Sequence, residues 1–244
     1  MERMPYGWRG KIGLIYIASA YAMETEFQKM SPEGVTTHTT RVALSDHPDY
    51  FSIDDLTNLD ADVMEATKLL AQAPLKSIAY GCTSGSFVNG LDYDKQLIKR
   101  MEQIAKIPCT TTATAVLAAA EGLQVQNIAI ATPYASDVNE RAYEYFTSGG
   151  LTITNMTGLS MMNDYKISEL NLQTIYNMAT KTITNDSEAI FISCTGLSTL
   201  PLINALEKDL NVPVITSNQA TFWHALKLAH IQSGQMQLGT LFNL

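Results

Sequence analysis

Short apolar segments alternate with longer segments of helical period along most of the chain. The clearest helical segment is 53–73, where Ser52 and Asp55 form a helix-start signal and apolar residues recur at helical spacing. The short apolar segments predict strands at 12–18, 35–43, 76–80, 127–131, 151–156 and 188–192. The other segments of helical period predict helices at 93–104, 112–122, 138–148, 167–184, 200–210 and 220–229.

The order of these segments predicts an α/β fold with parallel sheets that helices cover on both faces. The same order occurs twice, since residues 11–15 resemble 126–130 and residues 79–83 resemble 191–195. We therefore expect two similar Rossmann-like lobes, 1–120 and 121–244, related by a pseudo-two-fold axis with the active site between them. A C-terminal helix that packs back on the first lobe is compatible with this division.

The composition favours a protein that binds small molecules over one that binds nucleic acid. Apolar residues make up 46% of the 244-residue chain, which is enough to bury a core. Charged residues make up only 16%, and the net charge of -8 is spread along the chain, so no basic face for phosphate groups is predicted. Backbone N–H groups and hydroxyls can still bind a small acid in such a protein.

The N-terminal region superficially resembles a secretion signal, because Arg3, Arg9 and Lys11 precede the apolar stretch 12–22. We interpret this stretch as a buried first strand, since the fold would otherwise lack one. No other stretch approaches the ~20 apolar residues of a membrane span, so no membrane association is expected. The three widely spaced cysteines fit a reducing cytoplasm better than a disulfide framework.

Two of these cysteines, Cys82 and Cys194, are the candidate catalytic residues. Each lies between a predicted strand and an expected helix start, and open parallel sheets bind ligands outside the carboxyl ends of their strands. The duplication is expected to place the two thiols face to face, in a setting that suits a carboxylate or an oxyanion and lowers thiol pKa values. The alternative is that both only pack in the core, but equivalent positions in a duplicated turn favour chemistry. Neighbouring residues that offer hydroxyls or backbone N–H groups are Thr83, Ser84, Thr195 and Gly196.

The remaining chemistry-bearing residues form weaker patterns. Tyr134 follows the first strand of the second half, and its phenol is expected either to bind a substrate carboxylate or to pack under a loop. Asn163 and Asp164 supply either one more polar contact or an ordinary turn. Cys109 directly follows a proline and is expected to be structural. The histidines show no metal-ligand spacing and no nucleotide motif occurs, so neither a metal nor another cofactor is expected.

Four ordered motifs carry a resemblance to a known family. They are Gly-Cys-Thr-Ser at 81–84, Ala-Thr-Pro-Tyr at 131–134, Ser-Cys-Thr-Gly-Leu at 193–197 and Thr-Ser-Asn-Gln-Ala at 216–220. From about residue 12 to residue 229, the chain resembles the maleate cis-trans isomerase and arylmalonate decarboxylase branch of the aspartate/glutamate racemase superfamily. The ectoine-utilisation protein A family has similar motifs.

The resemblance implies a cofactor-independent isomerase, because arylmalonate decarboxylases keep only the second cysteine and this chain has both. In the isomerase mechanism, Cys82 would add as a thiolate to an alkene carbon of maleate, and Cys194 would protonate the neighbouring carbon. Rotation about the new single bond and elimination would then yield fumarate. The residues implied in binding the carboxylates are Thr83, Ser84, Tyr134, Thr195 and Gly196, with Asn163 as a further candidate.

The chain departs from the family pattern in two loops. The loop after the first strand usually reads Pro-Ser-Ser-Asn, and here Ala20 stands where the family has an asparagine that holds a carboxylate. The order of Asn163 and Asp164 is also the reverse of the family's usual order. These departures keep open which small acid is the substrate, and also two alternatives: a two-cysteine racemase or epimerase, and a small-acid binding protein without turnover. The resemblance is consistent with a homodimer.

Overall fold

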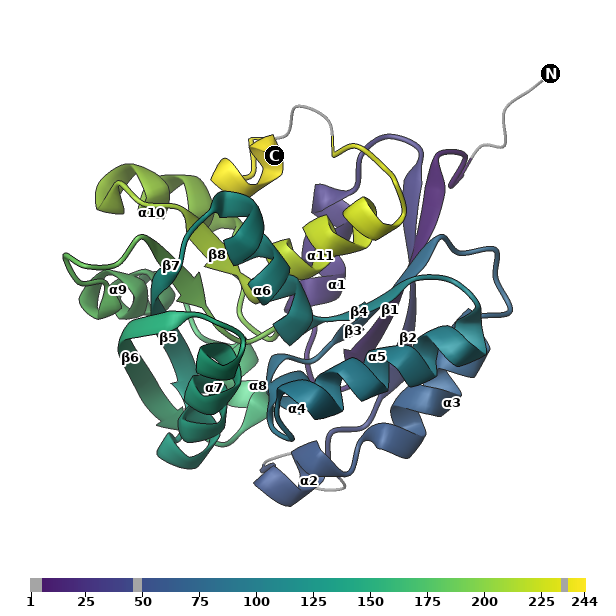
Figure 1. Ribbon diagram of the computed structural model, residues 1–244, viewed down its shortest axis with the longest axis horizontal. Helices are drawn as coiled ribbons and strands as arrows, with labels where there is room; N and C mark the ends of the chain where they lie inside the picture. Colours follow the sequence, from purple (N-terminus) through teal and green to yellow (C-terminus); the bar gives the residue numbers. More distant parts are fainter. Residues whose placement is uncertain (1–5, 46–49, 234–236) are drawn as a thin grey trace.

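Two four-stranded parallel sheets form the centre of the protein, one in each half of the chain (Figure 1). The computed structural model describes residues 6–45, 50–233 and 237–244. The first sheet has the order β2-β1-β3-β4, with β1 at Gly10–Ile17, β2 at Val35–Val42, β3 at Ser77–Gly81 and β4 at Cys109–Thr111. The second has the order β6-β5-β7-β8, with β5 at Asn127–Tyr134, β6 at Thr152–Met161, β7 at Ala189–Ile192 and β8 at Val214–Thr216. The predicted α/β class, with two similar parallel-sheet lobes, is confirmed.

The inner strands are buried on both faces, which explains their nearly continuous apolar sequences. Every residue of β3 and β7 is buried, and in β1 only Lys11 is partly exposed. The outer strands β2 and β6 alternate or expose more of their residues. The stretch 12–22 thus supplies most of a central strand and the start of the next helix, so its interpretation as a buried first strand is confirmed.

Helices connect successive strands and cover the two sheets, as Figure 1 shows. In the first half they are α1 (Ala22–Met30), α2 (Ile53–Thr57), α3 (Asp60–Leu70), α4 (Thr83–Phe87), α5 (Leu91–Ala105) and α6 (Thr112–Leu123). In the second half they are α7 (Ser136–Ser148), α8 (Asp164–Ser168), α9 (Leu172–Thr182), α10 (Ile203–Leu210) and α11 (Ser217–Leu228). Two short 3-10 helices, η1 (Leu200–Leu202) and η2 (Thr240–Asn243), complete the described part of the chain.

The prediction of one continuous helix over 53–73 is wrong, because α2 and α3 are separate. The helix-start signal is correct: Ser52 and Asp55 form a reciprocal capping box at the start of α2. The amide of Asn58 donates a 2.8 Å hydrogen bond to the carbonyl of Asp54. Asparagine side chains that bond to nearby backbone groups compete with the helical pattern, and here the helix ends at Thr57.

The predicted helix over 167–184 is also divided, into α8 and α9. Asn171 begins the second of these, since its side chain accepts a hydrogen bond of 2.9 Å from the backbone N–H of Thr174. The apolar pattern did not predict α1. A helix start was expected directly after each of Cys82 and Cys194, and α4 confirms it after Cys82, although its five residues have only modest helix propensity.

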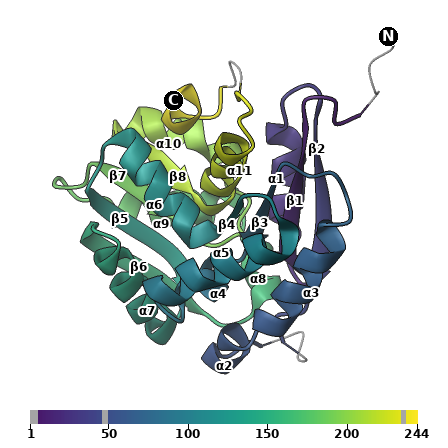
Figure 2. The same ribbon diagram turned by 45° about the vertical axis from the view of Figure 1, so that its right-hand side comes forward.

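The helix α11 belongs to the second half of the chain but packs on the first sheet. It lies against β3, β4, α1 and α6, and Figure 2 shows it beside α6 where the two halves meet. The hydroxyl of Ser77 in β3 donates a 2.8 Å hydrogen bond to the carbonyl of Ala225 in α11. The helix α6 in turn contacts β8 and η2 of the second half. The exchange of these helices builds one continuous core across the two sheets.

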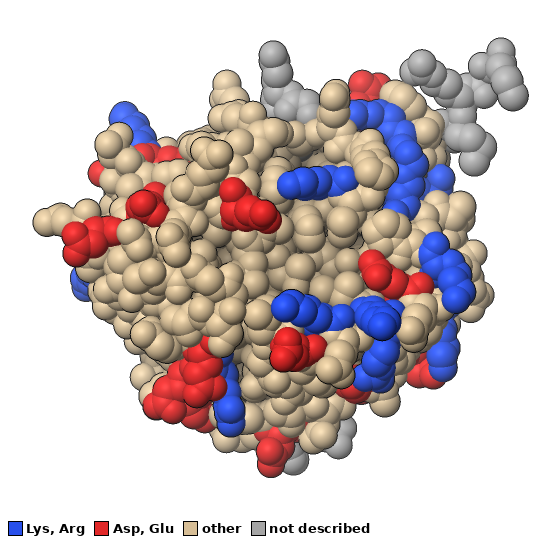
Figure 3. Space-filling view, viewed as in Figure 1, with Lys and Arg blue, Asp and Glu red and all other residues tan. Residues whose placement is uncertain are grey.

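Charge on the surface is mixed. On the face in Figure 3, lysine and arginine lie mainly on the right-hand half, and acidic residues lie among them. Ion pairs such as Arg100 with Asp60 join residues of opposite charge at the surface of the protein. In the described ranges, none of the helices combines the length and apolar character needed to cross a membrane.

Candidate active site

Cys82 lies at the carboxyl end of β3, where the chain turns into α4. It is the N-cap residue of that helix, and its Sγ accepts a hydrogen bond of 3.3 Å from the backbone N–H of Gly85. The hydroxyl of Ser84 lies 3.9 Å from the same sulfur. A helix start presents several backbone N–H groups to one point, so this position stabilises negative charge on the sulfur.

Cys194 takes the equivalent place after β7 but has a different backbone. Its φ angle is 110°, in a region that residues with a side chain rarely adopt. The chain continues as a turn rather than the expected helix, and the next element, η1, begins at Leu200. The backbone N–H of Gly196 donates a 3.4 Å hydrogen bond to the Cys194 sulfur. Each thiol therefore faces one backbone N–H donor, supplied by a helix at Cys82 and by a strained turn at Cys194.

Hydrogen bonds tie the two cysteine loops together. The hydroxyl of Ser217 accepts from the backbone N–H of Cys194 at 3.0 Å and from the hydroxyl of Thr83 at 2.9 Å. The hydroxyl of Thr195 donates to the carbonyl of Gly81 at 3.4 Å. The two sulfurs are also close enough for a charge on Cys82 to raise the pKa of Cys194. The structure thus brings both predicted catalytic residues to one place between the lobes.

Tyr16 and Glu26 support the Cys194 loop from the first lobe. The buried hydroxyl of Tyr16 accepts from the backbone N–H of Met23 at 3.2 Å and donates to the carbonyl of Thr195 at 3.0 Å. The Glu26 carboxylate accepts from the backbone N–H groups of residues 199 and 200 at 2.7 and 2.8 Å, and from the amide of Asn218 at 2.7 Å. These contacts hold the turn after Cys194 in its unusual conformation.

The thiol pKa values differ from the expectation drawn from the sequence. Burial raises the pKa of Cys82 to about 11 and that of Cys194 to about 12. The N–H of Gly85 at the first thiol, and the hydroxyl of Tyr134 and the N–H of Gly196 at the second, act in the opposite direction without offsetting burial. The expectation of lowered pKa values is therefore wrong. Desolvation of a thiolate at these fully enclosed positions outweighs single hydrogen bonds, so both groups are thiols at neutral pH.

A tyrosine hydroxyl lies beside each thiol. Tyr80, two residues before Cys82 in the sequence, lowers the pKa of that thiol through its hydroxyl, and Tyr134 does the same for Cys194. Tyr134 is only 2% exposed, and its ring packs edge-on against Phe87. Burial raises the pKa of both phenols well above the ordinary value, which keeps them protonated and able to donate.

Asp164 lies close to both thiols, while the neighbouring Asn163 caps a helix. The Asn163 side chain accepts a 2.8 Å hydrogen bond from the backbone N–H of Lys166 at the start of α8. The charge of Asp164 is, after burial, the largest contribution that raises the pKa of Cys194, and it also raises the pKa of Cys82. The role of Asn163 in substrate binding stays a prediction, and Asp164 is the member of this pair that acts on the thiols.

Several residues of the site had no signal strong enough to reveal them in the sequence. Tyr16 is one of many apolar-strand residues, and Glu26 lies in a helix that was not predicted. Ser217 belongs to the hydroxyl-rich helix start at 216–220, which was recognised as a motif but given no role. The residues of the second lobe that bond to Glu26 and Tyr16 are 173 to 192 positions away in the sequence, and such pairings are not visible in local patterns.

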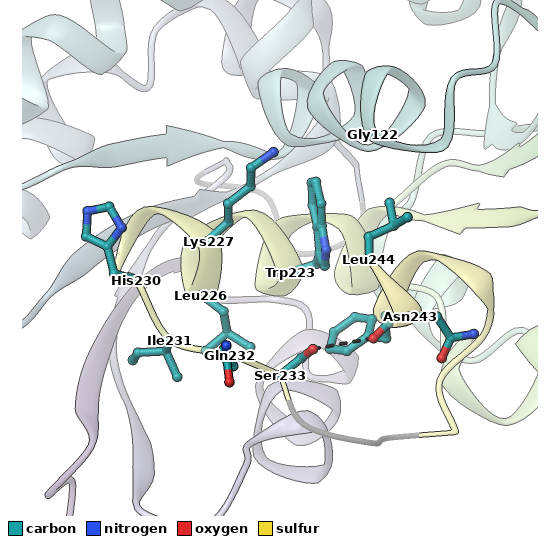
Figure 4. Close-up of a pocket in the computed structure, with 11 residues that line it drawn as sticks. Gly122, Trp223, Leu226, Lys227, His230, Ile231, Gln232, Ser233, Asn243 and Leu244 are labelled. Carbon is teal, nitrogen blue, oxygen red and sulfur yellow. Dashed lines mark hydrogen bonds between the residues drawn. The ribbon is translucent and has the colours of Figure 1, made fainter.

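A separate cavity of about 780 Å³ lies at the opposite end of α11 (Figure 4). Trp223, Lys227 and His230 line it together with the C-terminal segment. Ser217, which contacts the cysteine loops, is ten residues before Lys227, or roughly 15 Å along a helix. This cavity is thus distinct from the thiols. In the described part of the chain, no group of three or more histidine, cysteine or acidic side chains is placed to hold a metal ion.

Similarity to known proteins places the chain in a family, since a family model described as arylmalonate decarboxylase matches residues 12–242. The chain belongs to the arylmalonate decarboxylase family. Arylmalonate decarboxylase of Bordetella bronchiseptica is 35% identical over 149 residues, which are 60% of this chain and 62% of that enzyme, so the match spans less than two thirds of this relative. Maleate isomerase of Pseudomonas putida is 23% identical over 235 residues, or 91% of this chain and 92% of that enzyme.

The structure of the maleate cis-trans isomerase of Nocardia farcinica has a similar fold. It superposes on this chain with a TM-score of 0.88 at 19% sequence identity, and the aligned part covers 96% of this chain and 98% of the Nocardia chain. That protein, a cysteine-to-serine mutant, carries a covalently bound succinylcysteine intermediate. This structural similarity confirms the two-lobed α/β architecture of the chain.

Proposed function

We propose that this protein is a cysteine-dependent isomerase of a small carboxylic acid, of the cis-trans type, that needs no cofactor. The observation that carries the proposal is the pair of thiols at equivalent strand ends, joined through Ser217. Cys82 and Cys194 each have one backbone N–H donor and one nearby tyrosine hydroxyl. Two such thiols on opposite sides of a planar substrate supply a nucleophile and a proton donor.

The proposed reaction begins once Cys82 has lost its proton to solvent. The thiolate adds to one alkene carbon, forming a C–S bond, while the Cys194 thiol gives its proton to the neighbouring carbon. The former double bond is then a single bond and can rotate. Cys194 takes a proton back as the C–S bond breaks, which restores the alkene in the trans form and returns both sulfurs to their starting states. The succinylcysteine of the Nocardia enzyme is the type of intermediate that this addition produces.

The predicted binding residues divide into two groups by their present contacts. The hydroxyls of Thr83 and Thr195 join the two loops, so we assign them to positioning the thiols. Ser84 lies beside Cys82, and Tyr134 lies beside Cys194. We assign the hydroxyls of Ser84 and Tyr134 to binding the carboxyl groups of the substrate. Gly196 gives its N–H to the second sulfur, and a side chain at that position would approach the hydroxyl of Ser168 to 3.0 Å. Gly196 therefore leaves room for the Ser168 hydroxyl next to the second thiol.

A racemase or epimerase is the second candidate, and the near-equivalence of the two thiols favours it. In that reaction one cysteine removes the proton on an α-carbon and the other returns a proton from the opposite face. High pKa values of about 11 and 12 suit thiolates that act as strong bases on a carbon acid. No C–S bond forms in this case, which distinguishes it from the cis-trans reaction.

The experiment is a proton NMR time course of maleate with the wild-type protein, Cys82→Ser, Cys194→Ser and the matched control Cys109→Ser, under reducing conditions. We expect fumarate with the wild type and the control only, and an adduct on Cys82 by mass spectrometry in Cys194→Ser. In parallel samples in deuterated water, maleate is replaced by small amino acids, by hydroxy acids or by phenylmalonate. Exchange at an α-carbon without any adduct would support the racemase, and release of carbon dioxide from phenylmalonate would support a decarboxylase.

A further inference from the structure

Asp164 introduces a carboxylate into the site proposed above. It begins the five-residue helix α8 of the second lobe and is partly buried. The hydroxyl of Ser168, at the end of that helix, lies 3.0 Å from the position that a Cβ atom would take at Gly196, which is itself 3.6 Å from the Cys194 sulfur. The charge of Asp164 also raises the pKa of Cys194 and of Cys82. A single carboxylate at this position therefore acts on both thiols.

Ser19 holds this carboxylate in place from the other lobe. The Ser19 hydroxyl donates a hydrogen bond of 2.6 Å to Oδ2 of Asp164. Nearby, the hydroxyl of Tyr21 donates to the carbonyl of Ser168 at 3.0 Å, so the loop after β1 and the helix α8 are joined at two points. Between these anchors lies Ala20, whose side chain offers no polar group to a substrate. A charged group that this part of the site presents instead is the carboxylate of Asp164.

An ionised carboxylate accepts hydrogen bonds and repels other carboxylates. A substrate with a second carboxylate at this position would meet a like charge in a desolvated place. A substrate with a hydrogen-bond donor there would be bound favourably. Among donors, a primary carboxamide has a further property: it conjugates with the alkene and activates it toward thiol addition much as a carboxyl group does, whereas an ammonium group does not.

We propose that Asp164 is a specificity-determining residue that selects a cis-unsaturated acid with a primary carboxamide in place of the second carboxylate, the half-amide of a cis-butenedioic acid. This inference rests on the proposed cis-trans function. Oδ1 and Oδ2 of Asp164 accept from the amide N–H groups, and the single carboxylate of the substrate lies toward the hydroxyls of Ser84 and Tyr134. The addition, rotation and elimination steps are unchanged, and the product is the trans half-amide.

The ionisation of Asp164 gives the proposal a pH dependence. Burial raises the pKa of this carboxyl, while the hydrogen bond from Ser19 lowers it in part. The thiols of Cys82 and Cys194 and the Tyr16 phenol are the other titratable groups that face it, and all three have raised pKa values. These three groups are already protonated at neutral pH, so among them Asp164 is the group that takes up a proton as the pH falls, and its protonated form can donate to a carboxylate. Binding of a dicarboxylate should improve relative to the half-amide as the pH falls.

The test compares maleamate with maleate as substrates for the wild type, Asp164→Asn and the control Asp92→Asn, whose side chain is 94% exposed. We expect the wild type to prefer maleamate in kcat/KM by at least tenfold. Asp164→Asn keeps the shape and the acceptor for Ser19 but has no charge, so the ratio should move at least tenfold toward maleate. Asp92→Asn should leave the ratio unchanged.

A binding measurement separates this inference from the proposed function. Succinamate and succinate have no double bond and cannot react, and isothermal titration calorimetry gives their Kd values with wild type and Asp164→Asn. Tighter binding of succinamate to the wild type, with the preference lost in the variant, supports the role of Asp164 even if neither alkene is isomerised. Equal or tighter binding of succinate to the wild type would overturn it, whether or not maleate turns over. If the variant does not fold, the comparison of succinamate and succinate binding to the wild type decides the question by itself.

Discussion

The backbone N–H of Cys194 donates a hydrogen bond of 3.0 Å to the hydroxyl of Ser217. Cys194 lies two residues after the end of β7 and has a φ of 110°, which is unfavourable for a residue with a side chain. Ser217 begins α11, the helix that packs on the first sheet, and its hydroxyl also accepts from Thr83 beside the other thiol. One hydroxyl therefore sets the separation of the two cysteine loops and maintains the strained backbone at the second.

Replacement of Ser217 by alanine should lower both stability and activity. The change leaves the buried N–H of Cys194 without its acceptor, which costs roughly 1–3 kcal/mol in free energy of unfolding. Urea denaturation measures this loss, and maleate or maleamate turnover should fall more than tenfold because the loops are no longer held together. The control is Ser136→Ala, at an exposed serine in α7. A stability change no larger than that of the control would contradict the bridging role.

The thiol pKa values predict a steep pH dependence of alkylation. With a pKa of about 11, roughly one Cys82 in ten thousand is a thiolate at pH 7. The iodoacetamide rate at Cys82, followed by peptide mass spectrometry, should rise about tenfold per pH unit up to pH 10.

Asp164→Asn should accelerate this alkylation at a fixed pH, because removal of a negative charge lowers the pKa of both Cys82 and Cys194. Cys109 is an internal control: burial and then Glu102 raise its pKa to about 12, and Asp164 is not among the causes. Its rate should be the same in both proteins. Unchanged rates at Cys82 and Cys194 in the variant would place Asp164 farther from the thiols than we infer.

Gly85 leaves room for the Cys82 sulfur and the Tyr80 hydroxyl. A Cβ atom at Gly85 would lie 2.5 Å from that hydroxyl and 3.0 Å from the sulfur. Gly85→Ala should therefore destabilise the protein by about 1–3 kcal/mol, the usual range for overpacking, and should suppress turnover.

The double variant with Tyr80→Phe checks the cause of this loss. The buried Tyr80 hydroxyl has no hydrogen-bond partner of regular geometry within the described residues, so Tyr80→Phe alone should change stability little. In the double variant the closest contact of the new methyl group is gone, and the cost of Gly85→Ala should be smaller than in the wild-type background. Strictly additive costs in thermal or urea denaturation would argue against this contact.

Asp94 should make the protein less stable as the pH rises. Its Oδ2 accepts from Thr111, Thr114 and Tyr145, at 3.0, 2.6 and 2.7 Å, but burial still raises the pKa of the carboxyl. Because the folded pKa exceeds the unfolded one, the folded state binds the proton more tightly. The resulting stabilisation is complete below the unfolded pKa of about 4 and is lost as the pH rises through the folded pKa.

Asp94→Asn removes this titration. As the pH rises from 4 to 7, the variant should therefore gain stability relative to the wild type, so that its free energy of unfolding minus that of the wild type increases. Urea denaturation at several pH values measures the difference, and Asp92→Asn is the exposed control on the same helix. A difference that is constant with pH would show that Asp94 has an ordinary pKa in the folded protein.

The sequence by itself determined the α/β class, the duplication and the positions of most strands, because these follow from the period and spacing of apolar residues. It also predicted that Cys82 and Cys194 form a pair, since a duplicated turn after equivalent strands is visible without coordinates. It did not reveal where helices divide. The breaks near Asn58 and Asn171 depend on single side-chain hydrogen bonds that compete with a continuing apolar pattern.

Only the tertiary structure decided the chemical state of the site. The thiol pKa values are high because the folded chain removes both sulfurs from water, and desolvation is a property of the whole packing around an atom rather than of its neighbours in sequence. The Tyr16–Thr195 and Ser19–Asp164 contacts join residues that are 179 and 145 positions apart. Local spacing carries no information about such pairs, because the docking of the two lobes determines which side chains meet.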